Sequence, residues 1–274
     1  MTVRMVDVRG KKVEVMESGS GEPVVYLHDM WDLQTAQGCM FPFHEQLAAK
    51  FRLLAPAHPG CGESDSIKSI ADIDDLAFHY LDVLDALGLQ SAAIVGTGLG
   101  GWVATEIAVR NPERVSRLAL VGAAGLQMPG AQIADIFMYS QHRDGGIMRD
   151  LRDLLFADAD SALANSIVPD GRVNIPDEVR RYKSLTLAGR VGWEPPYLHD
   201  RKLLDRLHRI TAPALLIWGE QDRFVPLANG RAYEANLPKA ALKVLPGVGH
   251  SAILEAPEQC MALIAPFLST GAFP

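Results

Sequence analysis

The chain has 274 residues, 48% of them hydrophobic, so it can bury the core of one domain and still carry a substantial insertion. Its net charge of -7 and the lack of any cluster of lysines and arginines argue against nucleic acid as a partner. No apolar run reaches the length of a signal peptide or a membrane span, so we expect a cytoplasmic protein with no membrane partner.

Strands and helices are predicted to alternate along residues 1–126. The apolar runs predict strands at 12–16, 23–27, 52–55, 92–95 and 115–121, and helical patterns lie at 44–50, 73–87 and about 103–110. The alternation resumes after residue 207, with strands at 214–218 and 241–245 and helices at 231–236 and 257–268. This order is typical of a mostly parallel sheet covered by helices on both faces, the α/β class.

Residues 127–207 interrupt this alternation. They contain helical patterns at 133–139, 148–156, 178–188 and 200–207 but no convincing strand. We therefore predict an inserted helical cap at 127–207 and an α/β core formed by 1–126 and 208–274. The insertion is rich in Met, Phe, Tyr and Trp, and these side chains either form the core of the cap or line an apolar pocket beneath it.

The stretch from Ser91 to Arg110 is predicted to fold as a strand, a tight turn and a helix. Its glycines fit the nucleophile elbow, G-x-S-x-G, whose middle residue presents its side chain at the apex of the turn. Gly98 occupies that middle position, so the nucleophilic side chain is missing. The same glycines also match G-x-G-x-x-G, the dinucleotide-binding fingerprint, but the next strand does not end in the acidic residue that this site requires.

Two later loops follow strands, at the edge where open α/β sheets bind their ligands. Asp222 lies in a tight turn after strand 214–218, and His250 lies in a glycine-rich loop after strand 241–245. Taken singly, each residue could be structural. The chain order of elbow, acid and histidine instead favours a triad in which Asp222 orients the imidazole of His250 toward the elbow apex.

These motifs resemble those of the α/β-hydrolase-fold superfamily, and the likeness runs nearly end to end, from residues 23–28 to residues 247–250. The chain is similar to the single-domain bacterial esterases, lactonases and carbon-carbon bond hydrolases of that family, which carry a helical cap. The resemblance implies that Asp222 is the triad acid and His250 the triad base. It also implies that the N–H groups of Leu99 and of Met30, or a neighbour of Met30, form the oxyanion hole.

The chain departs from the family pattern at several positions. Gly98 replaces the usual Ser, or the Asp of dehalogenase-like members, so no covalent intermediate can form at that residue. Asp29 replaces the Gly of a His-Gly pair and brings a carboxylate beside the presumed oxyanion site, where it would repel developing negative charge. Ala57, Thr97 and Ser251 also differ from the residues usual at their positions.

Other side chains near the elbow are candidates for the missing nucleophile or for the pocket. Cys61 is a weak candidate, because nothing nearby in the sequence would lower the pKa of its thiol. His28 and His58 are expected to support loops rather than to react. The candidate oxyanion and pocket residues are Leu99, Met30, Asp29, His28, Trp31 and Thr97. Cys39, Cys61 and Cys260 are odd in number and widely spaced, so free thiols are expected.

Three functions fit these observations. The first is an enzyme for a small, largely apolar molecule that uses His250 and Asp222 without a serine, either activating water in the space left by Gly98 or moving a proton on the substrate. The second is a catalytically inactive paralogue or a small-molecule binding protein. The third is a serine hydrolase disabled by an engineered Ser-to-Gly substitution at position 98. We predict no cofactor, no metal, and a monomer or homodimer.

Overall fold

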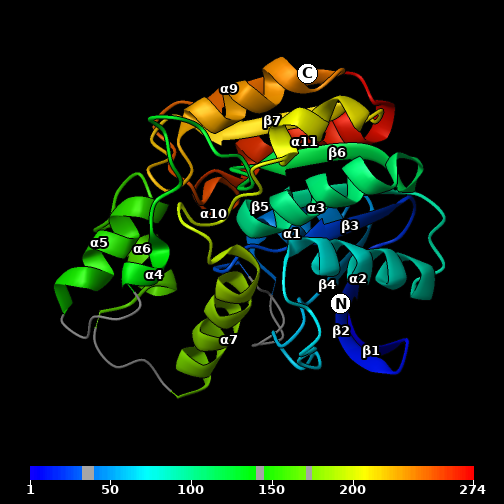
Figure 1. Cartoon of the computed structure of the whole chain (residues 1–274), viewed down its shortest axis with the longest axis horizontal. Coiled ribbons are helices and arrows are strands. Elements are labelled where there is room, and N and C mark those ends of the chain that lie inside the picture. The colour runs from blue at the N-terminus through cyan, green and yellow to red at the C-terminus, as the bar shows by residue number, and fades with distance from the viewer. Residues whose placement is uncertain (33–39, 140–144, 171–174) are drawn as a thin grey trace.

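The computed structural model describes residues 1–32, 40–139, 145–170 and 175–274 (Figure 1). Within these ranges the centre of the molecule is an eight-stranded sheet with the order β1-β2-β4-β3-β5-β6-β7-β8. Strands β3 to β8 pair in parallel, whereas β2 pairs antiparallel with both β1 and β4. The strands are β1 (Thr2–Val8), β2 (Lys11–Ser18), β3 (Pro23–Leu27), β4 (Arg52–Pro56), β5 (Ala92–Thr97), β6 (Val115–Val121), β7 (Ala214–Gly219) and β8 (Ala240–Leu245). The predicted α/β class is confirmed.

Helices flank this sheet and bury its central strands. Every residue of β5 and β7 is buried, which is why these strands appear in the sequence as continuous apolar runs. Helix α2 packs against α3, and α1 packs against α11, so segments far apart in the chain lie side by side. The helices of this part are α1 (Pro42–Ala48), α2 (Ile73–Ala86), α3 (Gly98–Arg110), α9 (Leu227–Asn236), α10 (Ala252–Glu255) and α11 (Pro257–Thr270).

Strand β1 was not predicted from the sequence. It is an edge strand, exposed along most of its length, so the alternation of apolar and polar residues is weak. Its antiparallel register with β2 is set by a tight turn at Arg9 and Gly10, which both have positive φ, 51° and 79°. Such a turn matches the twist of a β-hairpin, but Arg-Gly is a weaker sequence signal than Asn-Gly.

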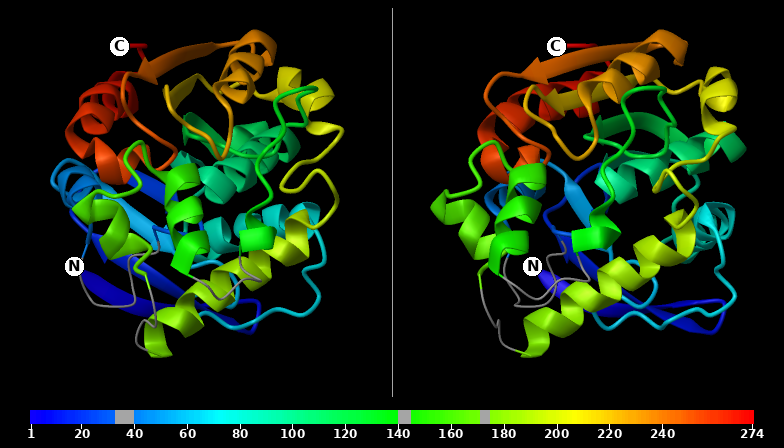
Figure 2. Two further views of the ribbon diagram at one scale, coloured as in Figure 1. Left: turned by 90° about the vertical axis from the view of Figure 1, so that its left-hand side faces the viewer. Right: turned by 60° about the vertical axis from the view of Figure 1, so that its left-hand side comes forward.

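The segment between β6 and β7 is helical in its described parts. Its helices are α4 (Ile136–Tyr139), α5 (Gly145–Leu155), α6 (Ala162–Ile167), α7 (Ile175–Gly192) and α8 (Leu203–Arg206). Helix α6 was not predicted, α7 is longer than expected, and the pattern at 200–207 forms the short α8 followed by a 3-10 turn at Leu207–Arg209. Figures 1 and 2 show α4 to α7 grouped on one side of the sheet, next to α10.

This helical segment contacts the loops that follow the parallel strands. The Ser251 N–H donates to the carbonyl of Leu155 at 2.8 Å, and the Ala134 N–H donates to the carbonyl of Phe224 at 2.9 Å. The Lys183 ammonium donates to the carbonyl of Gly62 at 2.7 Å. These bonds connect the segment to the loops after β8, β7 and β4, which are the loops that carry the candidate site.

The aromatic side chains of the segment divide between interior and surface. Phe137 and Phe156 are buried, whereas Tyr182 and Trp193 are exposed, at 72% and 53%. Phe137 also packs its ring against Trp193 and Tyr197. The buried rings of the segment thus belong to the same apolar core as the sheet, whereas Tyr182 and Trp193 leave aromatic rings at the surface.

Two further expectations concern cysteines and membranes. Cys61 and Cys260 are buried free thiols, and Cys39 lies outside the described residues. Among the helices that the structure describes, none combines the length and the apolar character that crossing a membrane requires.

Candidate active site

The turn between β5 and α3 has the geometry of a nucleophile elbow without the nucleophile. Gly98 is the first residue of α3 and has a φ of 46°, in the left-handed region that side chains rarely adopt. Strand and helix meet at this residue with no side chain at the apex.

The Asp29 carboxylate occupies the place of the missing side chain. A Cβ added to Gly98 would come closer than 3.0 Å to the carboxylate carbon and both oxygens of Asp29. Asp29 Oδ1 accepts the Leu99 N–H at 2.9 Å, so this carboxylate binds the backbone donor that was predicted for the oxyanion hole. The Asp29 side chain, from the loop after β3, therefore fills most of the space that Gly98 was expected to leave beside the imidazole.

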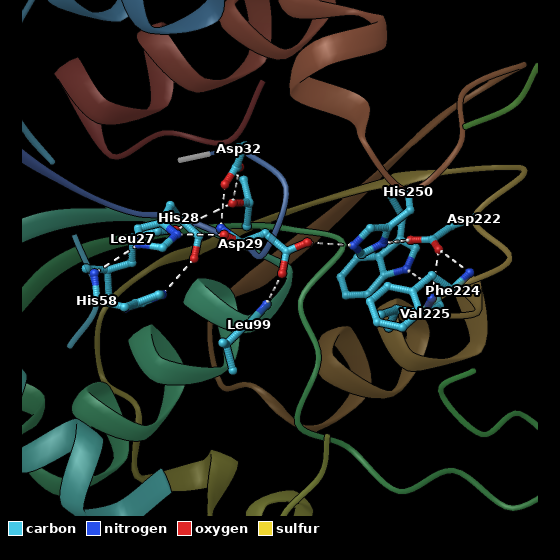
Figure 3. A network of polar contacts seen from close by, with 12 residues as sticks. Leu27, His28, Asp29, Asp32, His58, Leu99, Asp222, Phe224, Val225 and His250 are labelled. Atoms are coloured by element: carbon cyan, nitrogen blue, oxygen red, sulfur yellow. Dashed lines mark hydrogen bonds and ion pairs between the residues drawn. The ribbon is translucent and has the colours of Figure 1, made fainter. Parts of the chain in front are cut away.

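His250 lies between two carboxylates (Figure 3). Its Nδ1 is 2.8 Å from Asp222 Oδ2, and its Nε2 is 3.4 Å from Asp29 Oδ2. Asp222 is itself held by backbone N–H groups of the same turn, because its Oδ1 accepts from Phe224 at 3.0 Å and Val225 at 2.8 Å. The loops after β7 and β8 thus bring Asp222 and His250 together, and His250 faces the apex of the elbow through Asp29.

The surroundings of His250 favour its protonated form. Burial by itself lowers the pKa of the imidazole, but Asp222 and Asp29 together outweigh burial and raise it to about 10. The resting imidazole is therefore a cation near neutral pH. A cation can donate a proton at once, and it becomes a base only after that proton has left.

We expect the free energy of unfolding to fall as the pH rises from about 7 to about 10. The ordinary pKa of histidine is 6.5 and that of folded His250 is about 10, so between these values only the folded chain holds the proton. The stabilisation is complete below pH 6.5 and is lost as the pH passes 10. Urea unfolding at several pH values measures this, and Asp222→Asn should flatten the profile. If the free energy of unfolding of the wild type did not change over this pH range, the raised pKa of His250 would be contradicted.

Two buried histidines hold the backbone of the loop that carries Asp29. His28 Nδ1–H donates to the Asp29 carbonyl at 2.6 Å, and His28 Nε2 accepts the His58 N–H at 2.9 Å. His58 Nε2–H in turn donates to the His28 carbonyl at 2.8 Å. Burial lowers the pKa of His28 to about 4, so this ring is neutral, as its donor and acceptor roles require. Both histidines occupy positions consistent with the expected loop-supporting role.

Asp32 belongs to the same network but was not singled out in the sequence. Its Oδ1 accepts the Asp29 N–H at 2.5 Å, and its Oδ2 accepts the hydroxyls of Thr97, at 2.7 Å, and Tyr26. Burial, with a further contribution from Asp29, raises the pKa of Asp32 to about 7. The sequence signal that could have found it is a second acid three residues after Asp29, within the same loop.

Of the other sequence candidates, Trp31 and Thr97 line a small cavity beside the Asp29 carboxylate. This cavity of about 10 Å³, large enough for about one water, is lined by Asp29, Trp31, Thr97, Gly98, His250 and others. Met30 is buried. Cys61 lies near Ser184 in the helical segment, and burial raises the pKa of its thiol to about 11, so it is poorly suited to be a nucleophile.

The elbow does not suit a dinucleotide. A pyrophosphate would need the N–H groups at the start of α3, but Leu99 N–H already binds a carboxylate. Asp74, Glu106 and Asp200 form a cluster of acids among the described residues. Arg110 forms ion pairs with Asp74 and Glu106, and Arg206 forms one with Asp200, so each of these acids already has a cationic partner.

Comparison with known proteins agrees with this fold. A model of the alpha/beta hydrolase fold matches residues 36–257. The chain is 27% identical over 292 residues to 2-hydroxy-6-oxo-6-phenylhexa-2,4-dienoate hydrolase of Burkholderia cepacia, covering 99% of this chain and 96% of that protein. It is 31% identical over 275 residues to 2-hydroxy-6-oxononadienedioate/2-hydroxy-6-oxononatrienedioate hydrolase of Burkholderia vietnamiensis, covering 94% and 91%.

A solved structure also shares this fold. The meta-cleavage product hydrolase of Pseudomonas fluorescens superposes with a TM-score of 0.77 at 22% identity, over 98% of both chains. The two sequence relatives named above are hydrolases. Because the family model spans most of the chain and a relative above 30% identity covers nearly all of it, the chain belongs to the alpha/beta hydrolase fold family.

Proposed function

We propose that the protein is an enzyme that acts on a small, largely apolar molecule, with His250 as the proton-transfer group and no serine nucleophile. The proposal rests mainly on the 2.8 Å contact between His250 Nδ1 and Asp222. The other ring nitrogen, Nε2, faces the Asp29 carboxylate, which lies at the elbow apex beside Gly98. A protein that only binds a ligand has no need of an imidazole oriented by a buried carboxylate.

The substrate class follows from the surroundings of the site. The helical segment at 127–207, which we propose acts as a cap, contributes buried Phe137 and Phe156 beside the loops after β7 and β8. The relatives named above are hydrolases of dienoates with a phenyl or a second acid group. These features support a small organic substrate with an apolar body, cleaved or rearranged by proton transfer.

The proposal is tested by a thermal-shift screen of small organic compounds, including such dienoates, followed by incubation with each hit and mass analysis of the products. We expect at least one ligand that stabilises the protein and is converted to product. Binding without product from every hit would favour the inactive-relative alternative. One observation supports this alternative. The Asp29 carboxylate accepts the Leu99 N–H, so this donor is already occupied and is not free to bind a substrate oxyanion.

A further inference from the structure

The Asp29 carboxylate has the two neighbours that a nucleophile in this family requires. Oδ1 accepts the backbone N–H of Leu99 at 2.9 Å, and Oδ2 lies 3.4 Å from His250 Nε2. The carboxylate reaches this position from the loop after β3 (Figure 3), and it lies where a Cβ on Gly98 would be. One oxygen is thus bound by the donor that stabilises negative charge, and the other faces the group that transfers protons.

We propose that Asp29 is the nucleophile of this site and that it opens a small epoxide through an ester intermediate, which water then hydrolyses. This inference rests on the proposed function, because it uses the same His250. A carboxylate that attacks an acyl group would form a reactive anhydride, whereas its attack on a saturated carbon gives an alkyl ester that persists until water is activated.

The first step uses the proton that His250 holds. Asp29 Oδ2 forms a bond to one epoxide carbon, the bond from that carbon to the ring oxygen breaks, and the electron pair goes to this oxygen. His250 Nε2 gives its proton to the resulting alkoxide, so the product is a hydroxyalkyl ester of Asp29 and a neutral imidazole. An epoxide fits this site better than a halide, because an alkoxide needs the proton and a halide does not.

The second step reuses the neutral imidazole as a base. His250 takes a proton from water, and the hydroxide adds to the Asp29 carboxyl carbon. The negative charge then develops on Oδ1, which the Leu99 N–H already binds at 2.9 Å. Breaking the bond between this carbon and the ester oxygen releases an alkoxide, which takes up the proton of the new carboxylic acid and leaves as the alcohol. The net reaction adds one water to one epoxide and restores protonated His250 and ionised Asp29.

Two further observations fit this sequence. The cavity beside Asp29, Gly98 and His250 has about 10 Å³, which is room for about the one water that the second step consumes. Trp31 lines the same cavity, and its buried indole N–H has no hydrogen-bond partner in the part of the chain that the structure describes. This donor is available to the oxygen that becomes the alkoxide.

The position of Asp29 is fixed before any substrate arrives. Asp32 accepts its backbone N–H at 2.5 Å, and His28 donates to its carbonyl at 2.6 Å. Both neighbours are buried, and His58 and Thr97 hold them in turn. A nucleophile gains rate from such preorganisation, whereas a buried ion pair with His250 alone adds little stability.

The experiment follows an oxygen label and needs no variant. The wild-type protein is incubated with styrene oxide in 18O-labelled water, digested, and the peptide that contains Asp29 is weighed. Hydrolysis of an ester puts the labelled oxygen into the Asp29 carboxylate, so we expect this peptide to become heavier and styrene glycol to form. Labelled glycol with an unlabelled Asp29 peptide would overturn the proposal that Asp29 is the nucleophile. It would mean that His250 activates water for direct attack on the epoxide.

A second arm looks for the ester itself. Wild type quenched with acid during turnover should carry the ester on Asp29, whereas His250→Gln lacks both the proton of the first step and the base of the second, so it should carry none and form little glycol. Asp29→Asn should show no ester and should lower glycol formation by about 10³-fold or more. Asp85→Asn, an exposed acid on α2 paired with Arg114, is the matched control and should behave like wild type.

The outcomes separate this inference from the function on which it rests. No ester and no label with styrene oxide, while a screened compound is turned over, would overturn the epoxide nucleophile and leave the proposed function standing. Neither ester nor turnover with any compound would overturn both. Esterification of Asp29 by 1-bromobutane but not by styrene oxide would overturn the epoxide as the substrate class.

Discussion

Replacing His250 by alanine is expected to lower turnover of the substrate found by the screen by about 10²–10⁴-fold, the usual loss when a general acid or base is removed. The imidazole is buried, bonded to Asp222 at 2.8 Å and directed at Asp29, and no other described histidine lies in this position. The variant should bind the substrate nearly as well as wild type, because the loss affects proton transfer and not the apolar contacts. Steady-state kinetics therefore show a lower kcat with little change in KM.

Matched controls separate this effect from a general disturbance of the fold. His208→Ala removes an exposed histidine that bonds to the carbonyl of Asp205, away from the site, so its kcat should equal that of wild type. Cys61→Ala tests the thiol alternative and should also keep activity, because burial raises the pKa of that thiol to about 11. Full activity in His250→Ala would exclude the proton-transfer role. Loss of activity in Cys61→Ala, with the fold intact by circular dichroism, would point to the thiol instead.

Restoring the serine requires a second change as well. Gly98→Ser alone should produce no p-nitrophenyl ester hydrolysis, because its Cβ would overlap the Asp29 carboxylate, which also covers the Leu99 N–H. The double variant Gly98→Ser/Asp29→Gly removes both obstacles. It frees the oxyanion donor and leaves a hydroxyl next to His250. We expect its ester hydrolysis to exceed that of either single variant by about 10²-fold or more, the usual contribution of an oxyanion donor.

The stabilities of these variants give an independent measure of the clash. A serine at a φ of 46° carries strain of about 1–3 kcal/mol, and in the single variant the displaced carboxylate adds to this cost. We therefore expect Gly98→Ser to be the least stable variant in urea unfolding and Asp29→Gly to relieve part of its loss. Strong ester hydrolysis by Gly98→Ser alone would contradict the position of Asp29 and favour a hydrolase that merely lacks its nucleophile. Adding His250→Ala to the double variant should abolish the new activity.

Local patterns were sufficient to predict most of the architecture. Strands β3, β5, β6 and β7 are buried along most or all of their length, so their apolar runs stand out against the turns that flank them. The order of elbow, Asp222 and His250 along the chain predicted their convergence, because the ends of parallel strands meet at one edge of the sheet. Strand β1 and helix α6 were not predicted. Strand β1 is an exposed edge strand, and α6 is a short helix of 6 residues, so neither has a strong periodic pattern.

The sequence by itself determined that glycine and not serine stands at position 98 of the elbow, and that an acid and a histidine follow the elbow in the order of a triad. Only the tertiary structure decided what fills the space at Gly98, because Asp29 and Leu99 are separated by 70 positions in the chain. Whether the Asp29 carboxylate points to solvent or to the elbow depends on the path of its loop, which buried contacts with His28, His58 and Asp32 set. Periodicity reports which residues are buried, but it carries no information on which of two distant buried groups meet.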